Sequence, residues 1–363
     1  MTLTLIPISA GHSIDLQRAE ELIDALAAVD DDCGAELDLT QCRWIHPGAG
    51  YRVGHALARL HGRSTILVAG FDDFGGDWFR RMTRTGLGMA IAAHAERLLV
   101  DGQDRLDEAR DYYAARRFER PSFLSLRDLD GGGAVADETT FAQEKLRPWL
   151  SALGVQQGDI GENWRVFVDL FFEAICNIVD HAYRSPWQGQ AKNCSFALAA
   201  HSTLSDRADM AGDFAGYLGR ARQTDAGSKS QGWLEFVIAD DGVGQAARFT
   251  QDPTVYSGAI AAEDQPLVDS LRAGATVKYR VSDTVFRGTP GYGYSDIATA
   301  AQELDAYLEL RTGRRLLTMD GTTEDPQLTL HDTVLGYMPG TLLRVMLPLT
   351  SAQEELPPPE ASA

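Results

Sequence analysis

Three polar side chains recur at a four-residue spacing within a strongly apolar run. Glu173, Asn177 and His181 lie in the segment from Phe171 to Tyr183. Positions four apart share one face of an α-helix, so the three side chains form a ladder. A carboxylate, an amide and an imidazole are costly to bury without partners, and a ligand carrying a metal ion would supply them. A solvated helix face accounts equally well for this helix alone.

An Asp-x-Gly-x-Gly turn follows an apolar strand that we predict for Trp233 to Ala239. Asp240 lies where that strand ends, and a carboxylate there can accept a hydrogen bond from an exocyclic amine such as that of adenine. Gly242 and Gly244 allow the backbone to approach a flat ring closely. Taken alone, this motif is more typical of a plain turn.

A second glycine cluster, formed by Gly288, Gly291 and Gly293, precedes a helix that we predict for 295–304. Glycines before a helix expose backbone N–H groups, and the helix N-terminus favours anions. The cluster therefore indicates phosphate binding, although many such loops only join two elements. The Walker-type Gly-x-x-x-x-Gly-Lys-Ser/Thr motif is absent from the sequence, so the chain is not a P-loop protein.

The order of these three motifs resembles the GHKL superfamily, which includes histidine kinases, anti-sigma-factor serine kinases, gyrase and mismatch-repair ATPases. The segment from Glu173 to Tyr183 is similar to the N box of the anti-sigma kinases, and the two glycine motifs resemble the G1 and G2 boxes. The terminal run from Gly340 to Leu349 resembles the last strand of the family. The resemblance covers about residues 137–350 and implies a Bergerat-fold α/β sandwich, with helices packed on a mixed sheet and ATP between the layers.

The resemblance also implies roles for individual residues. Asn177 would bind Mg²⁺ through its amide oxygen, and Glu173 would be the catalytic general base for water or a hydroxyl nucleophile. Asp240 would read adenine, with Thr341 assisting through water, under a lid formed by 245–290. The other implied nucleotide contacts come from backbone glycines and from side chains at the ribose or adenine edge: Gly242, Gly244, Gly288, Gly291, Gly293, His181 and Tyr183. The lid cations that could reach a phosphate are Lys278, Arg280 and Arg287.

The amino-terminal part has a different pattern. Residues 1–115 alternate short apolar strands with amphipathic helices, which is typical of a small α/β layer structure. The stretch from Leu37 to Leu60 resembles a STAS domain of the anti-sigma-antagonist type, which would serve as a regulatory or docking module. We assign 116–136 to a linker and 351–363 to a disordered tail. The fold class we predict is thus α/β, with a STAS-like domain before the ATP-binding domain.

Two details limit the analogy for the amino-terminal domain. STAS antagonists carry a phosphorylatable Ser or Thr at the start of one helix, and the matching place here, Ile45 to Gly50, has no hydroxyl. Helical periodicity runs from Trp78 to Leu99, and His94 within it stands in a sequence loosely like a phosphoacceptor motif. We interpret His94 as an ordinary helix histidine. A dimerisation hairpin with a clear phosphoacceptor is missing, which disfavours a sensor histidine kinase.

Bulk properties exclude other classes. The 363 residues carry a net charge of −19, which argues against partners such as nucleic acid or an anionic membrane. The four cysteines show no Cys-x-x-Cys spacing, and neither a signal peptide nor a membrane-length apolar run is present. We therefore expect a cytoplasmic protein. The segment 201–231 is too long and polar for a plain hairpin loop, so we predict an insertion or a mobile loop.

Three functions fit these features. The first is a Mg²⁺- and ATP-dependent regulatory protein that resembles an anti-sigma-type serine/threonine kinase and phosphorylates a partner protein. The second is an ATP-hydrolysing conformational switch that controls a partner or a homodimer. The third is a nucleotide sensor that binds without turnover, which the presence of Glu173 disfavours.

Overall fold

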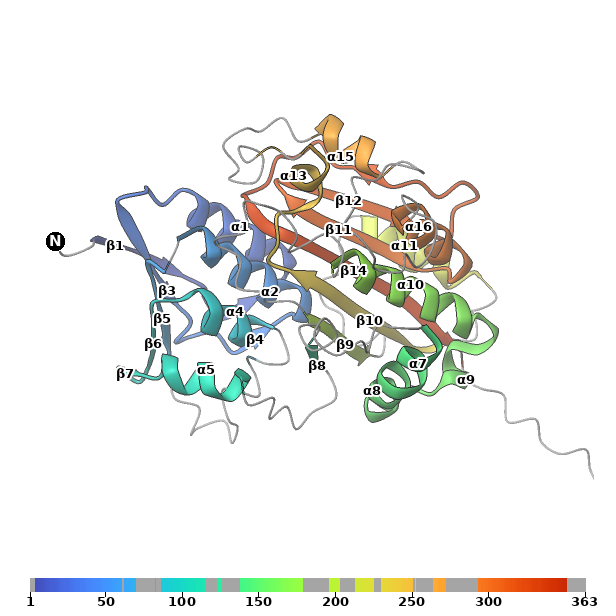
Figure 1. The fold of residues 1–363 in the computed structure, drawn as a ribbon, viewed down its shortest axis with the longest axis horizontal. Helices are drawn as coiled ribbons and strands as arrows, with labels where there is room; N and C mark the ends of the chain where they lie inside the picture. The colour runs from blue at the N-terminus through green and yellow to red at the C-terminus, as the bar shows by residue number, and fades with distance from the viewer. Residues whose placement is uncertain are drawn as a thin grey trace, which may run out of the picture.

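The computed structural model is α/β, as predicted, with two large sheets of different character (Figure 1). The structure describes residues 4–60, 62–69, 82, 86–114, 123–125, 138–178, 196–202, 213–224, 230–250, 252, 264–271 and 293–350. Each sheet has its own hydrophobic core. We call residues 4–114 the N-terminal unit and residues 123–350 the C-terminal unit.

The N-terminal unit is built on a five-stranded sheet in the order β1-β3-β5-β6-β7, parallel except for the edge pair β6–β7. Its strands are β1 (Thr4–Ser9), β3 (Cys33–Asp38), β5 (Ser64–Val68), β6 (Arg97–Val100) and β7 (Gln103–Asp104), and a separate short pair is formed by β2 (Ser13–Ile14) and β4 (Trp44–Ile45). Its helices are α1 (Leu16–Ala27), α2 (Pro47–Ala56), η1 (Leu57–Leu60), α4 (Leu87–His94) and α5 (Leu106–Ala114). The helix predicted to continue to Leu99 instead ends at His94, because Arg97–Val100 pair with β5.

Local sequence explains where the first two helices begin. The Asp15 carboxylate accepts a hydrogen bond of 2.7 Å from the backbone N–H of Arg18 and so caps α1. The buried face of α1 consists of Ala19, Leu22, Ile23 and Leu26. His46 caps α2 by accepting a 3.2 Å hydrogen bond from the backbone N–H of Gly48, and Pro47 occupies the first helical position, where its missing N–H is harmless.

The C-terminal unit has a seven-stranded sheet in the order β13-β12-β11-β14-β10-β9-β8. Its strands are β8 (Phe123–Ser125), β9 (Phe196–Ser202), β10 (Ser230–Asp240), β11 (Tyr307–Gly313), β12 (Arg315–Asp320), β13 (Thr329–Leu330) and β14 (Met338–Thr350). We expected a mixed sheet here, but each pairing described in it is antiparallel. The short turn between β11 and β12 requires that arrangement, because parallel neighbours need a long crossover. β8 lies within the expected linker.

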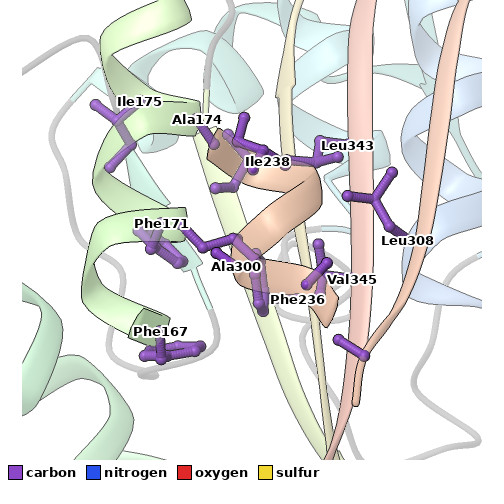
Figure 2. Packing of buried hydrophobic residues seen from close by; sticks show 14 of the residues in the cluster. Phe167, Phe171, Ala174, Ile175, Phe236, Ile238, Ala300, Leu308, Leu343 and Val345 are labelled. Atoms are coloured by element: carbon purple, nitrogen blue, oxygen red, sulfur yellow. The ribbon is translucent and has the colours of Figure 1, made fainter. Parts of the chain in front are cut away.

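Helices cover one face of this sheet. They are α7 (Glu138–Phe141), the π-helical η3 (Ala142–Leu146), α8 (Arg147–Ala152), α9 (Gln157–Ile160), η4 (Gly161–Asn163), α10 (Trp164–Asn177), α13 (Gln245–Thr250), α15 (Asp264–Ser270) and α16 (Gly293–Glu303). Figure 2 shows the apolar side of α10 against the strands. The rings of Phe167 and Phe171 lie 5.6 Å and 5.2 Å from that of Phe236 on β10, so aromatic packing holds α10 on the sheet.

The opposite face of the same sheet is covered by the N-terminal unit, with α2 lying against β14 (Figure 1). Tyr51 of α2 packs with Val237, Ala239, Met338 and Leu342. Part of the polar 201–231 segment contributes α11 (Asp213–Ala221), which packs on this face through a cluster that includes Tyr217 and Trp233. Within that segment, α11 is therefore a helix that extends the cover of the sheet.

Charged side chains are buried where the two units meet. Arg344 of β14 donates to Glu235 at 2.6 Å and to Glu309 at 3.1 Å. Arg52 of α2 lies 2.9 Å from Glu20 of α1 and also contacts Glu309. Burial raises the pKa of Glu20, but the guanidinium groups of Arg311 and Arg52 outweigh this effect and hold the pKa below its ordinary value. Each arginine of the network contacts glutamates, and this attraction offsets the cost of removing the charged groups from water.

The buried network predicts a large loss of stability when one cation is removed. We expect Arg344→Met to lower the free energy of unfolding by about 3–5 kcal/mol, because Glu235 and Glu309 stay buried without that partner. Urea unfolding followed by circular dichroism measures the loss. The matched control is Arg220→Met, which breaks a half-exposed pair with Asp320 and should cost less than about 1 kcal/mol. Equal small losses in both variants would contradict the prediction.

None of the helices in the described part of the chain combines the length and apolarity that a membrane crossing requires.

Candidate functional site

The strands of the C-terminal sheet present different chemistry on their two faces. On β10, Phe236 and Ile238 face the helical layer, whereas Val237 and Ala239 face the N-terminal unit. Alternation along an extended strand produces this division. Asp240 lies two residues after Ile238, so its side chain also points to the helical face, at the end of β10.

A pocket of about 470 Å³, part of it open to solvent, lies at that place. It brings together four of the residues predicted from the sequence, and they come from three separate parts of the chain: α10, the end of β10 with its turn, and β14. The lining residues are Ala174, Asn177, Ile178, Ile238, Asp240, Val243, Gly244, Gln245, Arg248, Ile297, Thr341 and Leu343. The walls are mostly apolar, with a few polar groups that converge, which is the usual composition of a small-molecule site.

Asp240 is the acidic group of this pocket and is only 4% exposed. Its Oδ1 accepts a 2.8 Å hydrogen bond from the backbone N–H of Gly242, and the backbone N–H of Thr341 also donates to the carboxyl group. Burial raises the pKa of Asp240 to about 7, and the neighbouring charge of Asp241 adds to that rise against the lowering effect of the two hydrogen bonds. A donor from a ligand would therefore meet a carboxyl group poised between its two protonation states.

Asn177 lies at the end of α10 and lines the same pocket. Within the described residues, its buried amide nitrogen has no hydrogen-bond partner. An unsatisfied buried amide costs about 1–3 kcal/mol, so a ligand that accepts from this nitrogen would gain that energy. Over the described residues, no group of three or more acidic, His or Cys side chains is placed to hold a metal ion.

The glycine turn after Asp240 is held in a conformation that needs glycine. Gly244 has a φ of +77°, and a Cβ there would lie 3.1 Å from Oγ1 of Thr312. That hydroxyl donates to the carbonyl of Gly340 at 3.1 Å and accepts from the backbone N–H of Gln245 at 3.1 Å. Gly340 has a φ of +76°, and a Cβ on it would overlap the backbone oxygen of Asp240. The turn therefore depends on a close approach of β10 and β14.

Glu173 lies one turn before Asn177 on α10 but is not among the residues that line the pocket. Its carboxylate instead belongs to a group of acids beside α7. Burial raises the pKa of Glu138 to about 7, with a hydrogen bond to Asp169 and the charges of Asp169 and Glu173 adding to the rise. A proton is therefore available next to Glu173 near neutral pH.

The second glycine cluster is described only at its last member. Gly293 is the first residue of α16, and Ile297, one turn further on, lines the pocket, so the start of this helix lies beside the site. Four predicted site residues fall outside the described residues: His181, Tyr183, Gly288 and Gly291. The three predicted lid cations also fall outside them: Lys278, Arg280 and Arg287.

Sequence reasoning missed one cation of the site. Arg248 lies on α13, is buried and lines the pocket. Arg248 falls within the predicted lid, 245–290, but the cations predicted to reach a phosphate lie further along the chain, at Lys278, Arg280 and Arg287. The sequence did carry a signal for Arg248. It lies four residues after Gly244, on a helix that starts directly after the glycine turn, and positions four apart share one helix face.

A scan against protein-family models finds no match to the chain, and a search of curated proteins finds no matching relative.

The raised pKa of Asp240 predicts a pH dependence of stability. Between about pH 4 and pH 7 the unfolded chain has already released this proton, whereas the folded protein keeps it, so the contribution of Asp240 to stability falls as pH rises. Asp240→Asn removes this loss. Relative to wild type, we expect the variant to gain on the order of a few kcal/mol in unfolding free energy between pH 5 and pH 8.

Urea titrations at the two pH values measure this difference. The exposed Asp325→Asn provides the control and should show the same difference from wild type at both. A pH-independent effect of Asp240→Asn would contradict the assignment.

Proposed function

We propose that the C-terminal unit binds Mg·ATP in this pocket and that the protein is an ATP-dependent regulatory protein of the GHKL type, with a Bergerat-like arrangement of helices on a sheet. One observation carries the proposal. Asn177, Asp240, Gly244 and Thr341, predicted as nucleotide contacts from motifs far apart in the sequence, line one pocket.

The chemistry of the pocket suits both an adenine ring and phosphates. Asp240 can accept from the exocyclic amine of adenine, and apolar side chains such as Ile238 and Leu343 can pack on the flat ring. Arg248 adds positive charge to the wall, which favours a phosphate. The start of α16 brings further backbone N–H groups towards the same place.

The residues present also fit a magnesium ion that is carried by the nucleotide. Mg²⁺ takes only one or two oxygen ligands from a protein when substrate phosphates and water supply the others. Asn177 offers one such oxygen, and its amide nitrogen could then donate to a phosphate. When bound, the ion would neutralise charge on the phosphates during transfer.

We propose phosphoryl transfer to a hydroxyl of a separate partner protein as the activity. Glu173, one turn from Asn177, would take the proton from the attacking hydroxyl, and the neighbouring acid Glu138 would exchange protons with it near neutral pH. The N-terminal unit packs on the opposite face of the sheet from the pocket, so it is not placed to receive the phosphate within the same chain. The partner therefore has to approach from the helical side.

An ATP-dependent conformational switch is the second candidate. The same strands that carry Asp240 and Thr341 on one face carry the interface with the N-terminal unit on the other. Nucleotide binding that shifts these strand ends would therefore alter how the two units pack. Incubation with γ-labelled ATP separates the candidates. Label on a protein acceptor supports the kinase, release of free phosphate alone supports the switch, and tight binding with neither supports a sensor.

We predict that Asn177→Ala abolishes measurable Mg·ATP binding, because the variant removes both the metal ligand and the phosphate donor. The fold should be retained. A loss of 100-fold or more in affinity corresponds to about 3 kcal/mol. Isothermal titration calorimetry measures it, and circular dichroism checks the fold. The control is Asn163→Ala at the other end of the same helical segment, where the side chain donates to the carbonyl of Glu303. An unchanged affinity in Asn177→Ala would remove Asn177 from the site.

We predict that Glu173→Gln keeps ATP affinity within about threefold of wild type but lowers turnover by about 10²–10⁴-fold, because it removes only the base. Turnover is measured as phosphate release or protein labelling under saturating ATP. Glu162→Gln, an exposed acid just before α10, is the control and should turn over normally. Full turnover in Glu173→Gln would exclude Glu173 as the base.

A further inference from the structure

Asp241 stands next to the pocket acid Asp240 but points the other way. Its carboxylate is fully buried towards the N-terminal unit. His94, the last residue of α4, approaches it there: Nε2 of His94 lies 3.3 Å from Oδ2 of Asp241, within ion-pair distance although outside hydrogen-bond geometry. The His94 side chain is only 3% exposed. A buried carboxylate is stabilised by a nearby donor, so this contact bears on the position of the whole turn.

A second histidine of the N-terminal unit stands behind the neighbouring strand. Nδ1 of His55 on α2 lies 3.4 Å from the backbone oxygen of Pro339, two residues before the pocket residue Thr341. The His55 ring packs on Tyr51 with ring centroids 3.7 Å apart, and it meets the His94 ring edge-on at 5.9 Å. The two histidine rings therefore contact each other. His94 lies against the end of β10, and His55 lies against the start of β14.

The two strand ends are tightly coupled to one another. Gly340 lies so close to Asp240 that a side chain atom would overlap the Asp240 backbone oxygen. The backbone N–H of Thr341 donates to the Asp240 carboxyl group. A shift of either end by a fraction of an ångström would therefore move the acid and its donor together, because packed interiors transmit small displacements.

We propose that His94 is a positioning residue of the nucleotide pocket, supported by His55, so that the N-terminal unit completes the ATP site from the far side of the sheet. This inference rests on the proposed function. It assigns the N-terminal unit a direct part in nucleotide affinity. By thermodynamic linkage, a nucleotide that selects one position of the turn must also stabilise the contact between α4 and Asp241.

The test compares two substitutions at one position in the full-length chain. His94→Phe keeps a ring in the buried site but removes both nitrogens, whereas His94→Gln keeps a donor that can reach Asp241. We expect His94→Phe to weaken Mg·ATP binding about tenfold or more, and His94→Gln to restore the affinity to within about threefold of wild type. A residue that mattered only for packing would show the opposite order. His12→Phe, at an exposed histidine, is the control.

Hydrogen exchange of wild-type protein gives a second readout that does not depend on any variant folding. Addition of Mg·ATP should slow amide exchange in Leu87–His94, and unchanged exchange there would overturn the inference. Equal affinity of His94→Phe and wild type would also overturn it, leaving the proposed function intact. Failure of the wild-type chain to bind Mg·ATP would overturn both proposals.

Discussion

The arrangement of the protein depends on a sheet that is buried on both faces. Antiparallel sheets commonly leave one face in water, and their strands then alternate apolar and polar side chains. On β10 and β14 both series are buried: Phe236 and Val345 face the helices, while Val237 and Leu342 face the N-terminal unit. Alternate side chains of these strands therefore point into two different hydrophobic cores. The pocket acid and the unit interface are, as a result, adjacent residues of one strand.

Charge inside the second interior explains why the two units meet in one orientation. A buried carboxylate without its cation is costly, so an orientation that separates these charges is disfavoured. In the observed packing of α2 on β14, both Arg344 and Arg52 form ion pairs with Glu309. Burial lowers the pKa of Arg52 to about 10, against the opposing effect of Glu20, so this arginine stays charged at neutral pH. We infer that the network contributes specificity of docking more than net stability.

The sequence predicted the local position of several pocket residues better than the architecture around them. Helical spacing predicted that Asn177 lies on a helix, and the strand–turn pattern predicted that Asp240 lies at a strand end; both hold because both signals are local. The buried charges at the unit interface gave no such signal, since Glu235, Glu309 and Arg344 read as ordinary polar positions on the outer face of a sheet. Only tertiary contact shows that this face is covered. The same limit applies to Arg97–Val100, where pairing with β5 overrides the helical periodicity.

The N-terminal unit resembles a STAS docking module in sequence, but the position that would carry the switch residue is buried against the C-terminal unit. The start of α2, where a switch residue would stand in a STAS antagonist, carries His46, which is buried and lies 3.8 Å from Glu235. A phosphate added there would enter an interior that already holds two carboxylates bound to Arg344. Like-charge repulsion and desolvation would oppose it. Regulation through this unit would therefore act by moving the packed interface as a whole, and the contact of His94 with Asp241 is where such movement would reach the proposed nucleotide pocket.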